Sequence, residues 1–269
     1  MLKKITRTFI RLIFTLLSRV ELIGLDRVPR DGGLLIAVNH LSRVDPPLVF
    51  AFIPRSDVTA LVADKYQKYP FIRWVINIIG GIWLSREEAD VRALKEARSY
   101  LKSGKALGIA PEGTRSRTGG LNPAKTGAAY LADKADVPII PVGVWGTEDA
   151  FQKLYRLKRP PIYAHFGRPF KLPPLDRRDR AAGLERNTDE IMCRIAALLP
   201  EAWNKRLVDV NVGDLSDEQI AWADMVFISA MLIQVASAQE IIHRCKAQGK
   251  TVVVGGPAAT TRPERFTNV

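Results

Sequence analysis

Cysteine is scarce in this sequence, and so is histidine. The 269 residues include two cysteines and three histidines. Two thiols form at most one disulfide, which excludes the cross-linked framework of small secreted domains. These residues also lack the spacing of a metal-binding motif, so no metal site is expected. We therefore expect a protein of a reducing compartment, with enough chain for one large domain or two modest ones.

A long hydrophobic run is missing near the N-terminus. The longest uncharged stretch there, residues 12–18, is far shorter than the roughly 20 residues that span a bilayer. Residues 2–19 instead predict an amphipathic helix, because their basic and apolar side chains fall on opposite sides, with Phe14 as the exception. The apolar side carries Leu2, Ile5, Phe9, Leu12, Ile13, Leu16 and Leu17, and the basic side carries Lys3, Lys4, Arg7 and Arg11.

Two placements fit this helix. It could lie on a membrane surface, or it could pack on the protein core with its basic side in solvent. Its scattered arginines and the lack of a small-residue cleavage site argue against a secretory signal peptide. A second apolar stretch, residues 70–83, could add to a membrane-facing surface or form a buried helix followed by a strand. We predict a peripheral protein on the cytoplasmic face of the cell membrane, with residues 1–20 as its surface helix.

Acidic residues are outnumbered in this chain. It has 40 Lys and Arg against 28 Asp and Glu, a net charge of +12, and residues 205–269 hold seven of each sign. The excess therefore lies before residue 205. It suits anionic lipid, where each basic residue near the surface contributes about 1 kcal/mol. Nucleic acid is not expected as a partner, because the basic residues are scattered and no zinc-finger, RNP-like or basic-zipper pattern is present.

His40 and Asp45 form the first candidate catalytic pair. Histidine titrates near neutrality, and a carboxylate can hold its ring in the tautomer that takes a proton from an alcohol. On one helix, positions five apart would point about 140° away from each other. The pair therefore predicts a turn between a strand at residues 34–38 and a helix opened by Pro46 or Pro47. Taken alone, this spacing also fits a loop histidine without a catalytic role.

Three later segments follow this motif in order. Residues 80–86 form a glycine turn and a short apolar strand that ends in arginine. Residues 110–116 place a glutamate, a glycine and an arginine on a tight turn after the apolar run 106–110. Residues 137–144 form an apolar strand interrupted by two prolines. With the His-x-x-x-x-Asp motif, these segments resemble the four sequence blocks of the phospholipid/glycerol acyltransferase family, over about residues 1–203.

This resemblance implies a fold and a reaction. Residues 21–203 would form an α/β domain with a mixed sheet flanked by helices, similar to 1-acylglycerol-3-phosphate acyltransferases. The domain would move a fatty acyl group from acyl-CoA or acyl carrier protein to the free hydroxyl of 1-acylglycerol-3-phosphate, giving phosphatidate in phospholipid biosynthesis. His40 would be the general base, and Asp45 would orient its ring and stabilise the imidazolium. No cofactor beyond the acyl thioester co-substrate is implied.

The resemblance assigns the acceptor phosphate to two arginines, Arg86 and Arg115. Their planar guanidinium groups can bind a phosphate through two hydrogen bonds. A carboxylate near a phosphate needs a cation or a hydroxyl as partner, so Glu112 is expected to hold Arg115 or the acceptor hydroxyls. Two simpler alternatives are that Arg86 is a solvated strand end and that Glu112 is an ordinary turn residue.

Gly113, Thr114 and Lys125 are the remaining candidate substrate-binding residues. Gly113 would permit a positive φ and a close backbone approach. Lys125 could contact phosphate or the acyl donor, or it could simply start a helix. The fourth segment has no titratable group, so it would line the acyl-chain side or form a core strand. Its candidate residues are Pro138, Ile139 and Pro141.

The chain changes character near residue 204. Short apolar strands alternate there with polar helices, the rhythm of a doubly wound α/β domain. The strands are predicted at residues 206–212, 225–231 and 251–255, and the helices at residues 216–224 and 237–248.

Residues 207–212 and 222–231 resemble part of the cobalamin-binding-like domain that precedes the catalytic barrel of certain radical S-adenosylmethionine enzymes. An earlier strand and helix, a cysteine triad for an iron–sulfur cluster and an Asp-x-His-x-x-Gly motif are not found in this sequence. Residues 204–269 are therefore expected to form an incomplete, Rossmann-like α/β segment.

Two other functions fit the sequence. One is the same acyl transfer to another lysolipid acceptor. The other belongs to a different class, a corrinoid- or nucleotide-binding module that the N-terminal part anchors to a membrane.

Overall fold

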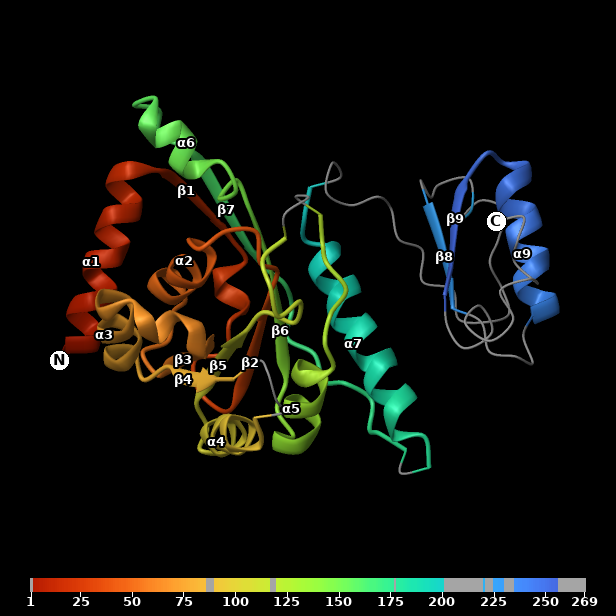
Figure 1. Cartoon of the computed structure of the whole chain (residues 1–269), viewed down its shortest axis with the longest axis horizontal. Coiled ribbons are helices and arrows are strands. Elements are labelled where there is room, and N and C mark those ends of the chain that lie inside the picture. Colours follow the sequence, from red (N-terminus) through yellow and green to blue (C-terminus); the bar gives the residue numbers. More distant parts are fainter. Residues whose placement is uncertain are drawn as a thin grey trace. The chain divides into compact units, whose positions relative to one another are not determined.

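The chain folds as two compact units, Met1–Leu199 and Pro200–Val269. The computed structural model describes residues 2–85, 90–116, 120–176, 178–200, 220, 225–229 and 235–255 (Figure 1).

A seven-stranded mixed sheet forms the middle of the first unit (Figure 1). The strand order is β1-β7-β6-β2-β5-β3-β4, with β6 and β7 antiparallel and the other neighbours parallel. The predicted α/β fold with a mixed sheet flanked by helices is confirmed. The strands are β1 (Arg19–Ile23), β2 (Leu34–Val38), β3 (Val58–Ala63), β4 (Ile82–Leu84), β5 (Ala106–Ile109), β6 (Ile139–Trp145) and β7 (Pro161–Phe166).

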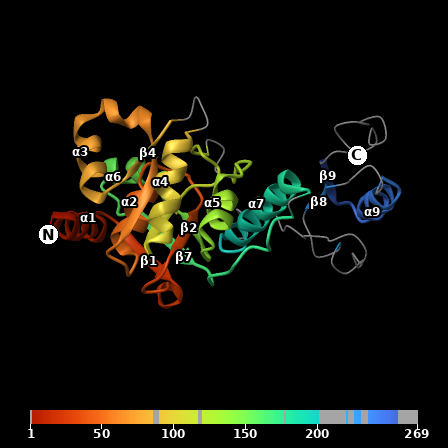
Figure 2. The same cartoon turned by 90° about the horizontal axis from the view of Figure 1, so that it is seen from below.

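Helices cover both faces of this sheet (Figures 1 and 2). One face carries α1 (Leu2–Leu17), α2 (Asp45–Phe52) and α3 (Pro70–Ile79), and the other carries α4 (Val91–Lys102), α5 (Gly127–Ala135) and α7 (Arg180–Ala196). The short helix α6 (Ala150–Tyr155) connects β6 to β7, and two 3-10 turns, Leu25–Arg27 and Asp64–Lys68, complete the unit. Within the described part of the chain, none of the helices has both the length and the apolarity needed to cross a membrane.

The central strand β2 consists of five apolar residues, and all five are buried. Leu34, Ile36 and Val38 belong to the core on the α1–α3 side, and Leu35 and Ala37 belong to the core on the α4–α7 side. A parallel strand that is covered on both faces reads as continuously apolar rather than alternating. The prediction of a strand at residues 34–38 is confirmed.

Helix α1 packs on the domain with its basic side, which overturns one of the two predicted placements. The guanidinium groups of Arg7 and Arg11 donate to the carbonyl of Ala51 in the last turn of α2, at 3.1 Å and 2.8 Å, and Arg7 also donates to the carbonyl of Arg55. Cationic donors are favourable at a helix C-terminus, where carbonyls lack partners. Phe14, the exception to the helix pattern, is buried on this inner side.

The apolar side of α1 faces outward. Its seven large apolar residues are each between 39% and 63% exposed. A helix packed on the core with its basic side in solvent is therefore the wrong interpretation of residues 2–19. The exposed residues are Leu2, Ile5, Phe9, Leu12, Ile13, Leu16 and Leu17.

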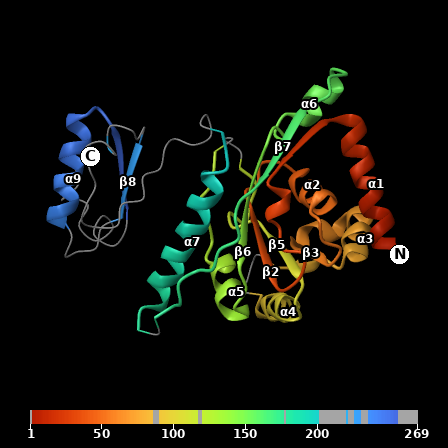
Figure 3. The same cartoon turned by 180° about the vertical axis from the view of Figure 1, so that it is seen from behind.

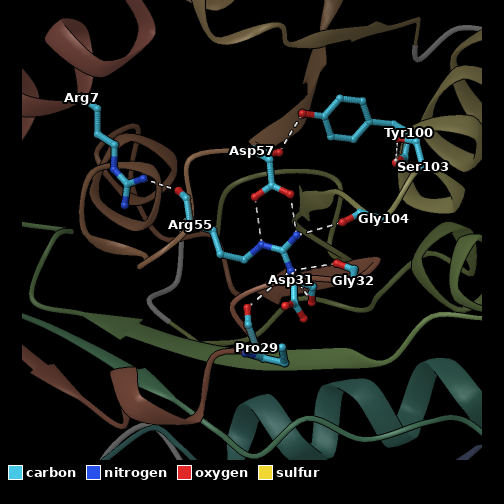
Figure 4. Close-up of polar contacts among 9 residues, drawn as sticks. All are labelled: Arg7, Pro29, Asp31, Gly32, Arg55, Asp57, Tyr100, Ser103 and Gly104. Carbon is cyan, nitrogen blue, oxygen red and sulfur yellow. Dashed lines mark hydrogen bonds and ion pairs between the residues drawn. The ribbon is translucent and has the colours of Figure 1, made fainter.

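A fully buried arginine, Arg55, joins three loops of the first unit (Figure 4). Its guanidinium pairs with Asp57 through two hydrogen bonds of 2.9 Å and 2.5 Å. The same group donates to the carbonyls of Asp31, Gly32 and Gly104 at 3.1, 2.8 and 3.1 Å. The charge is thus compensated and the donors are satisfied, as burial of an ion requires. The hydrogen bonds from Arg55 also lower the pKa of Asp57.

The second unit contains a parallel strand pair connected by a helix. In its described residues, β8 (Met225–Ser229) pairs in parallel with β9 (Thr251–Gly255), and α9 (Val235–Ala247) lies between them in the chain. These elements match the predicted strand, helix and strand within a few residues. The other predicted elements, a strand at 206–212 and a helix at 216–224, lie outside the described residues except for Ile220.

Candidate active site

The candidate site residues gather where three neighbouring parallel strands end. Strands β6, β2 and β5 are adjacent and parallel, so their carboxyl ends meet at one edge of the sheet. Ligands of α/β proteins commonly bind at such an edge. The His40–Asp45 turn follows β2, residues 110–116 follow β5, and Thr147 follows β6. The two turns are tied together, since the amide of Ser116 donates to the carbonyl of His40 at 2.8 Å.

His40 and Asp45 are in contact. The Nδ1 atom of His40 lies 3.1 Å from Oδ2 of Asp45, whose side chain is fully buried. Oδ2 also accepts from the amides of Leu41 and Ser42, at 2.7 Å and 2.6 Å. Asp45 starts helix α2, with the two prolines in its first turn as predicted, and its carboxylate is favoured at the positive end of the helix dipole. With Nδ1–H donated to Asp45, Nε2 of His40 is the nitrogen left to accept a proton.

Thr147 holds the second oxygen of Asp45. Its hydroxyl lies 2.5 Å from Oδ1, and both residues are fully buried. The sequence analysis missed this residue because 102 positions separate it from Asp45. Its position in the sequence could have revealed it, because Thr147 comes two residues after β6, a strand that pairs with β2.

Asn39 fixes the start of the same turn. Its buried side-chain amide exchanges two hydrogen bonds with the backbone of Val144, at 2.9 Å and 2.7 Å. This pairing extends the β2–β6 ladder with a side chain. It places His40 at a fixed distance from the end of β6. The sequence analysis missed this residue too, although it is adjacent to His40.

Glu112 has partners that differ from the predicted ones. Its two oxygens accept from the backbone amides of His40 and Asn122, at 2.8 Å and 2.9 Å. Arg115 is not among its ion-pair partners in the described part of the chain. Turns after strands leave amides that need acceptors when buried, and this carboxylate supplies two. Burial raises the pKa of Glu112, and the hydrogen bonds from the two amides act in the opposite direction.

Gly113 and Lys125 lie against each other beside this turn. Gly113 has the positive φ that was predicted, 65°. A Cβ atom at this position would lie 3.3 Å from Cδ of Lys125, so a larger residue would displace the lysine. Thr114 and Lys125 are exposed, and Arg115 is half-buried. Neither Arg115 nor Lys125 forms an ion pair with a described residue. Arg86, the other predicted phosphate ligand, lies outside the described residues.

A cavity of about 680 Å³ opens beside the His40–Asp45 pair. The pair, Gly113 and Lys125 line its polar part. The rest is mostly apolar and is formed by strands β2 to β5 and helices α1 to α5, with Ile10, Val38, Phe50 and Ile76 as examples. Arg43, an exposed residue within the His-x-x-x-x-Asp motif, also lines it and was missed by the sequence analysis.

The fourth segment forms a core strand. Strand β6 lies between β2 and β7, and Ile139 and Pro141 are buried. Among the described lining residues of the cavity, none comes from Pro138, Ile139 or Pro141. Of the two predicted roles, the structure favours a core strand over an acyl-side surface.

Fold and site together define an α/β domain in which a buried aspartate holds a histidine that lines a largely apolar cavity. Comparisons with known proteins assign this class more narrowly. Residues 19–145 match the sequence model of the Acyltransferase family. Residues 19–145 of the first unit are therefore similar to the Acyltransferase family, and the resemblance found in the sequence is confirmed.

Known relatives agree with this assignment. The crystal structure of the 1-acyl-sn-glycerophosphate (LPA) acyltransferase PlsC from Thermotoga maritima is 28% identical with a TM-score of 0.56, covering 76% of this chain and 81% of that one. The 1-acyl-sn-glycerol-3-phosphate acyltransferase of Borreliella burgdorferi is 28% identical over 137 residues, 50% of this chain. The chain spans about half of that relative, 54%.

A different protein matches a shorter stretch. The hopanoid C-2 methylase of Rhodopseudomonas palustris is 38% identical over 74 residues, which cover 28% of this chain and 14% of the methylase. This similarity is only a weak indication for the cobalamin-binding-like interpretation of residues 204–269.

Proposed function

We propose that the first unit transfers a fatty acyl group from an acyl thioester to the free hydroxyl of 1-acylglycerol-3-phosphate, giving phosphatidate. The observation that carries this proposal is the contact between His40 and buried Asp45 in the lining of a largely apolar cavity. The printed names of the relatives, 1-acyl-sn-glycerol-3-phosphate acyltransferase, support the choice of acceptor.

The reaction needs one base and no protein nucleophile. Nε2 of His40 removes the proton from the acceptor hydroxyl while its oxygen attacks the thioester carbonyl carbon. A C–O bond forms, and the carbonyl electron pair moves to oxygen in a tetrahedral intermediate. When the carbonyl re-forms, the C–S bond breaks and the thiolate takes the proton from the imidazolium. Asp45 stabilises that imidazolium and keeps Nδ1 protonated throughout.

Cations beside His40 would bind the acceptor phosphate. Arg115 and Lys125 stand on or beside the turn after β5, and Arg43 lines the same cavity. A guanidinium can hold two phosphate oxygens at once, whereas an ammonium acts as a point charge. We assign the phosphate to these groups together with Arg86. Glu112 acts indirectly, by fixing the backbone of His40.

The apolar part of the cavity would hold an acyl chain. Its walls come from strands β2 to β5 and helices α1 to α5, and they are mostly apolar. Burial of each methylene there contributes about 0.8 kcal/mol. The donor would be acyl-CoA or acyl carrier protein.

We further propose that the chain is a peripheral membrane protein of the cytoplasmic face, bound to anionic lipid through α1. The outward apolar side of α1 and the net charge of +12 support this placement. Apolar residues that lie in a row on an exposed helix favour the membrane interface, and basic residues add attraction to anionic headgroups.

The test is acyl transfer from labelled acyl-CoA, and in parallel from acyl carrier protein, to 1-acylglycerol-3-phosphate in detergent micelles. His40→Ala should lower turnover by about 10²–10⁴-fold, the usual contribution of a general base. His243→Ala, at an exposed position on α9, is the matched control and should keep wild-type turnover. Near-wild-type turnover of His40→Ala would eliminate His40 as the base. If the folded wild type uses neither donor, another lysolipid acceptor becomes the next candidate.

For residues 204–269 we propose a partial cobalamin-binding-like domain. The parallel β8–α9–β9 arrangement and the short similarity to a hopanoid methylase support it. A cobalamin titration followed by absorbance tests this proposal and the alternative corrinoid-binding function. An unchanged spectrum at high protein concentration would rule out both.

A further inference from the structure

The tip of helix α6 carries the two most exposed large apolar side chains in the described part of the chain, and a third lies nearby on the same helix. Leu157 is 96% exposed, Tyr155 is 89% exposed and Phe151 is 58% exposed. Figures 1 and 3 show α6 projecting past the β6–β7 end of the sheet. A folded domain gains nothing from holding such residues in water, so three of them at one tip indicate a contact surface.

This tip has a defined conformation. The amides of Leu157 and Lys158 donate to the carbonyls of Leu154 and Lys153, both at 2.9 Å, and close the end of the helix. Leu157 adopts a positive φ of 56° there. Glycine is the usual residue at such a helix end, because a side chain is strained in the left-handed conformation. A leucine at this position therefore presents an apolar side chain outward while its backbone adopts a strained conformation.

The tip is attached to the end of α1. The guanidinium of Arg159 donates to the carbonyls of Thr15 and Ser18, at 2.6 Å and 2.8 Å. These two carbonyls belong to the last turn of α1 and the residue after it. The exposed apolar side of α1, which ends with Leu16 and Leu17, is thus joined to the tip by a direct contact.

The charges around the tip suit an anionic lipid surface. Arg156 and Lys158 flank Leu157 and are exposed. Lys153 is paired with Asp149 at 2.8 Å, and Arg159 is engaged with α1. Tyrosine and phenylalanine place an apolar ring at headgroup depth, and neighbouring basic side chains reach the lipid phosphates. This combination distinguishes a lipid surface from a neutral protein partner.

We propose that Phe151, Tyr155 and Leu157 form a second membrane-contact element, the α6 tip, which enters the interface of an anionic bilayer beside α1. The proposal rests on the proposed membrane association of α1 and extends it. Because Arg159 joins the α6 tip to α1, the two elements together would fix the tilt of the domain on the bilayer. Helix α1 alone would leave the domain free to rotate about the axis of that helix.

Co-sedimentation with phosphatidylcholine vesicles, with and without 30% phosphatidic acid, tests the tip. Tyr155→Asp with Leu157→Asp should weaken binding to the anionic vesicles at least tenfold. Val91→Asp is the matched control, since Val91 is 72% exposed and begins α4, away from α6 in Figure 1. The control should bind like the wild type. Equal binding of the tip variant and the wild type would overturn the proposal, as would a wild type that fails to bind.

A fluorophore measures insertion directly. An environment-sensitive dye on Leu157→Cys, with Cys193 and Cys245 changed to alanine, should brighten and shift to shorter wavelength on anionic vesicles. The same dye on Val91→Cys should not respond. An unresponsive dye at position 157 on protein that sediments with vesicles would refute insertion. A tip variant that loses self-association in light scattering but keeps vesicle binding would assign the tip to a second copy of the chain instead.

Turnover in detergent micelles separates this proposal from the catalytic one. Phe151, Tyr155 and Leu157 are not among the described residues that line the cavity, so the tip variant should keep wild-type turnover in micelles and lose it on vesicles. An inactive wild type that still inserts its tip would refute the proposed reaction and leave the membrane contact standing.

Discussion

At the scale of single residues, the carboxylate of Asp45 organises the site. It accepts hydrogen bonds from two backbone amides, one imidazole and one hydroxyl, with no exposure to solvent. A buried carboxylate is tolerated only when its oxygens have hydrogen-bond donors, so each donor offsets part of the cost of burying this group. The orientation of His40 therefore depends on groups that do not touch substrate.

Thr147 is expected to be a positioning residue. Thr147→Val removes the donor to Oδ1 of Asp45, and an unsatisfied buried oxygen costs about 1–3 kcal/mol. Turnover should fall about tenfold or more while KM changes little, because the histidine loses its orientation and not its contact with substrate. Thr147→Ser keeps the hydroxyl and should restore turnover. A valine variant with wild-type turnover would refute this role.

Glu112 should give the folded domain a distinct dependence on pH. Burial raises its pKa in the folded state above the value of 4.5 expected for an exposed glutamate. The folded state then binds more protons than the unfolded state above pH 4.5, so stability is highest below that pH and falls as pH rises through the folded pKa.

The measurement is urea unfolding of the wild type and Glu112→Gln from pH 4 to 8. The wild type should lose stability relative to the variant as pH rises, by at most about 1.4 kcal/mol per pH unit. At pH values above the folded pKa the difference should become constant. If the free energies of unfolding of the two proteins differ by the same amount at every pH, Glu112 does not titrate differently in the folded and unfolded states.

At the scale of elements, two arginine contacts set the position of α1. Arg7 and Arg11 satisfy carbonyls at the end of α2, the helix that begins with Asp45. Arg55 beneath them joins the loops at residues 29–32 and at Gly104 (Figure 4). Arg7 and Arg11 belong to the basic side of α1 that suggested contact with lipid headgroups, and both form hydrogen bonds within the protein instead.

Phe9 and Phe14, two phenylalanines of α1, should respond oppositely to substitution. Phe14 is 7% exposed and packs against Phe52, whereas Phe9 is 60% exposed. Phe14→Ala should destabilise the fold by about 3–5 kcal/mol, the usual cost of removing a buried ring. Phe9→Ala should leave thermal unfolding unchanged and weaken vesicle binding. Thermal melts and co-sedimentation of both variants check this, and equal effects on stability would contradict the observed face of α1.

At the scale of the whole molecule, the chain is two compact units with a boundary near residue 200. The first unit contains both apolar cores of the sheet and all described candidate site residues. Its core and its site do not depend on residues of the second unit that the structure describes.

A chain that ends at residue 203 should keep its fold and the proposed acyl transfer. Its melting temperature should lie within a few degrees of the first transition of the full chain, because the first unit has its own core. Turnover in micelles should be within twofold of the full-length value. Calorimetry and the micelle assay measure both, and an insoluble or inactive truncation would show that the units depend on each other.

Sequence patterns predicted the elements well where the signal is local. The apolar run at residues 34–38, the prolines after Asp45 and the glycine at 113 each report on their own backbone. The predicted contact between His40 and Asp45 follows from the same short turn. Partners distant in sequence were missed or wrong, as with Thr147 and the amides that Glu112 accepts from.

The sequence by itself determined the α/β class of the first unit, the strand at residues 34–38 with the helix that follows it, and the resemblance of this unit to an acyltransferase family. Only the tertiary structure decided which side of α1 faces outward, which groups hold Asp45 and where the apolar tip of α6 stands. The physical reason is the distance along the chain over which each kind of interaction acts. Periodicity and turn chemistry act over a few residues, whereas a hydrogen bond across adjacent strands or an arginine at the end of another helix depends on packing that no local pattern encodes.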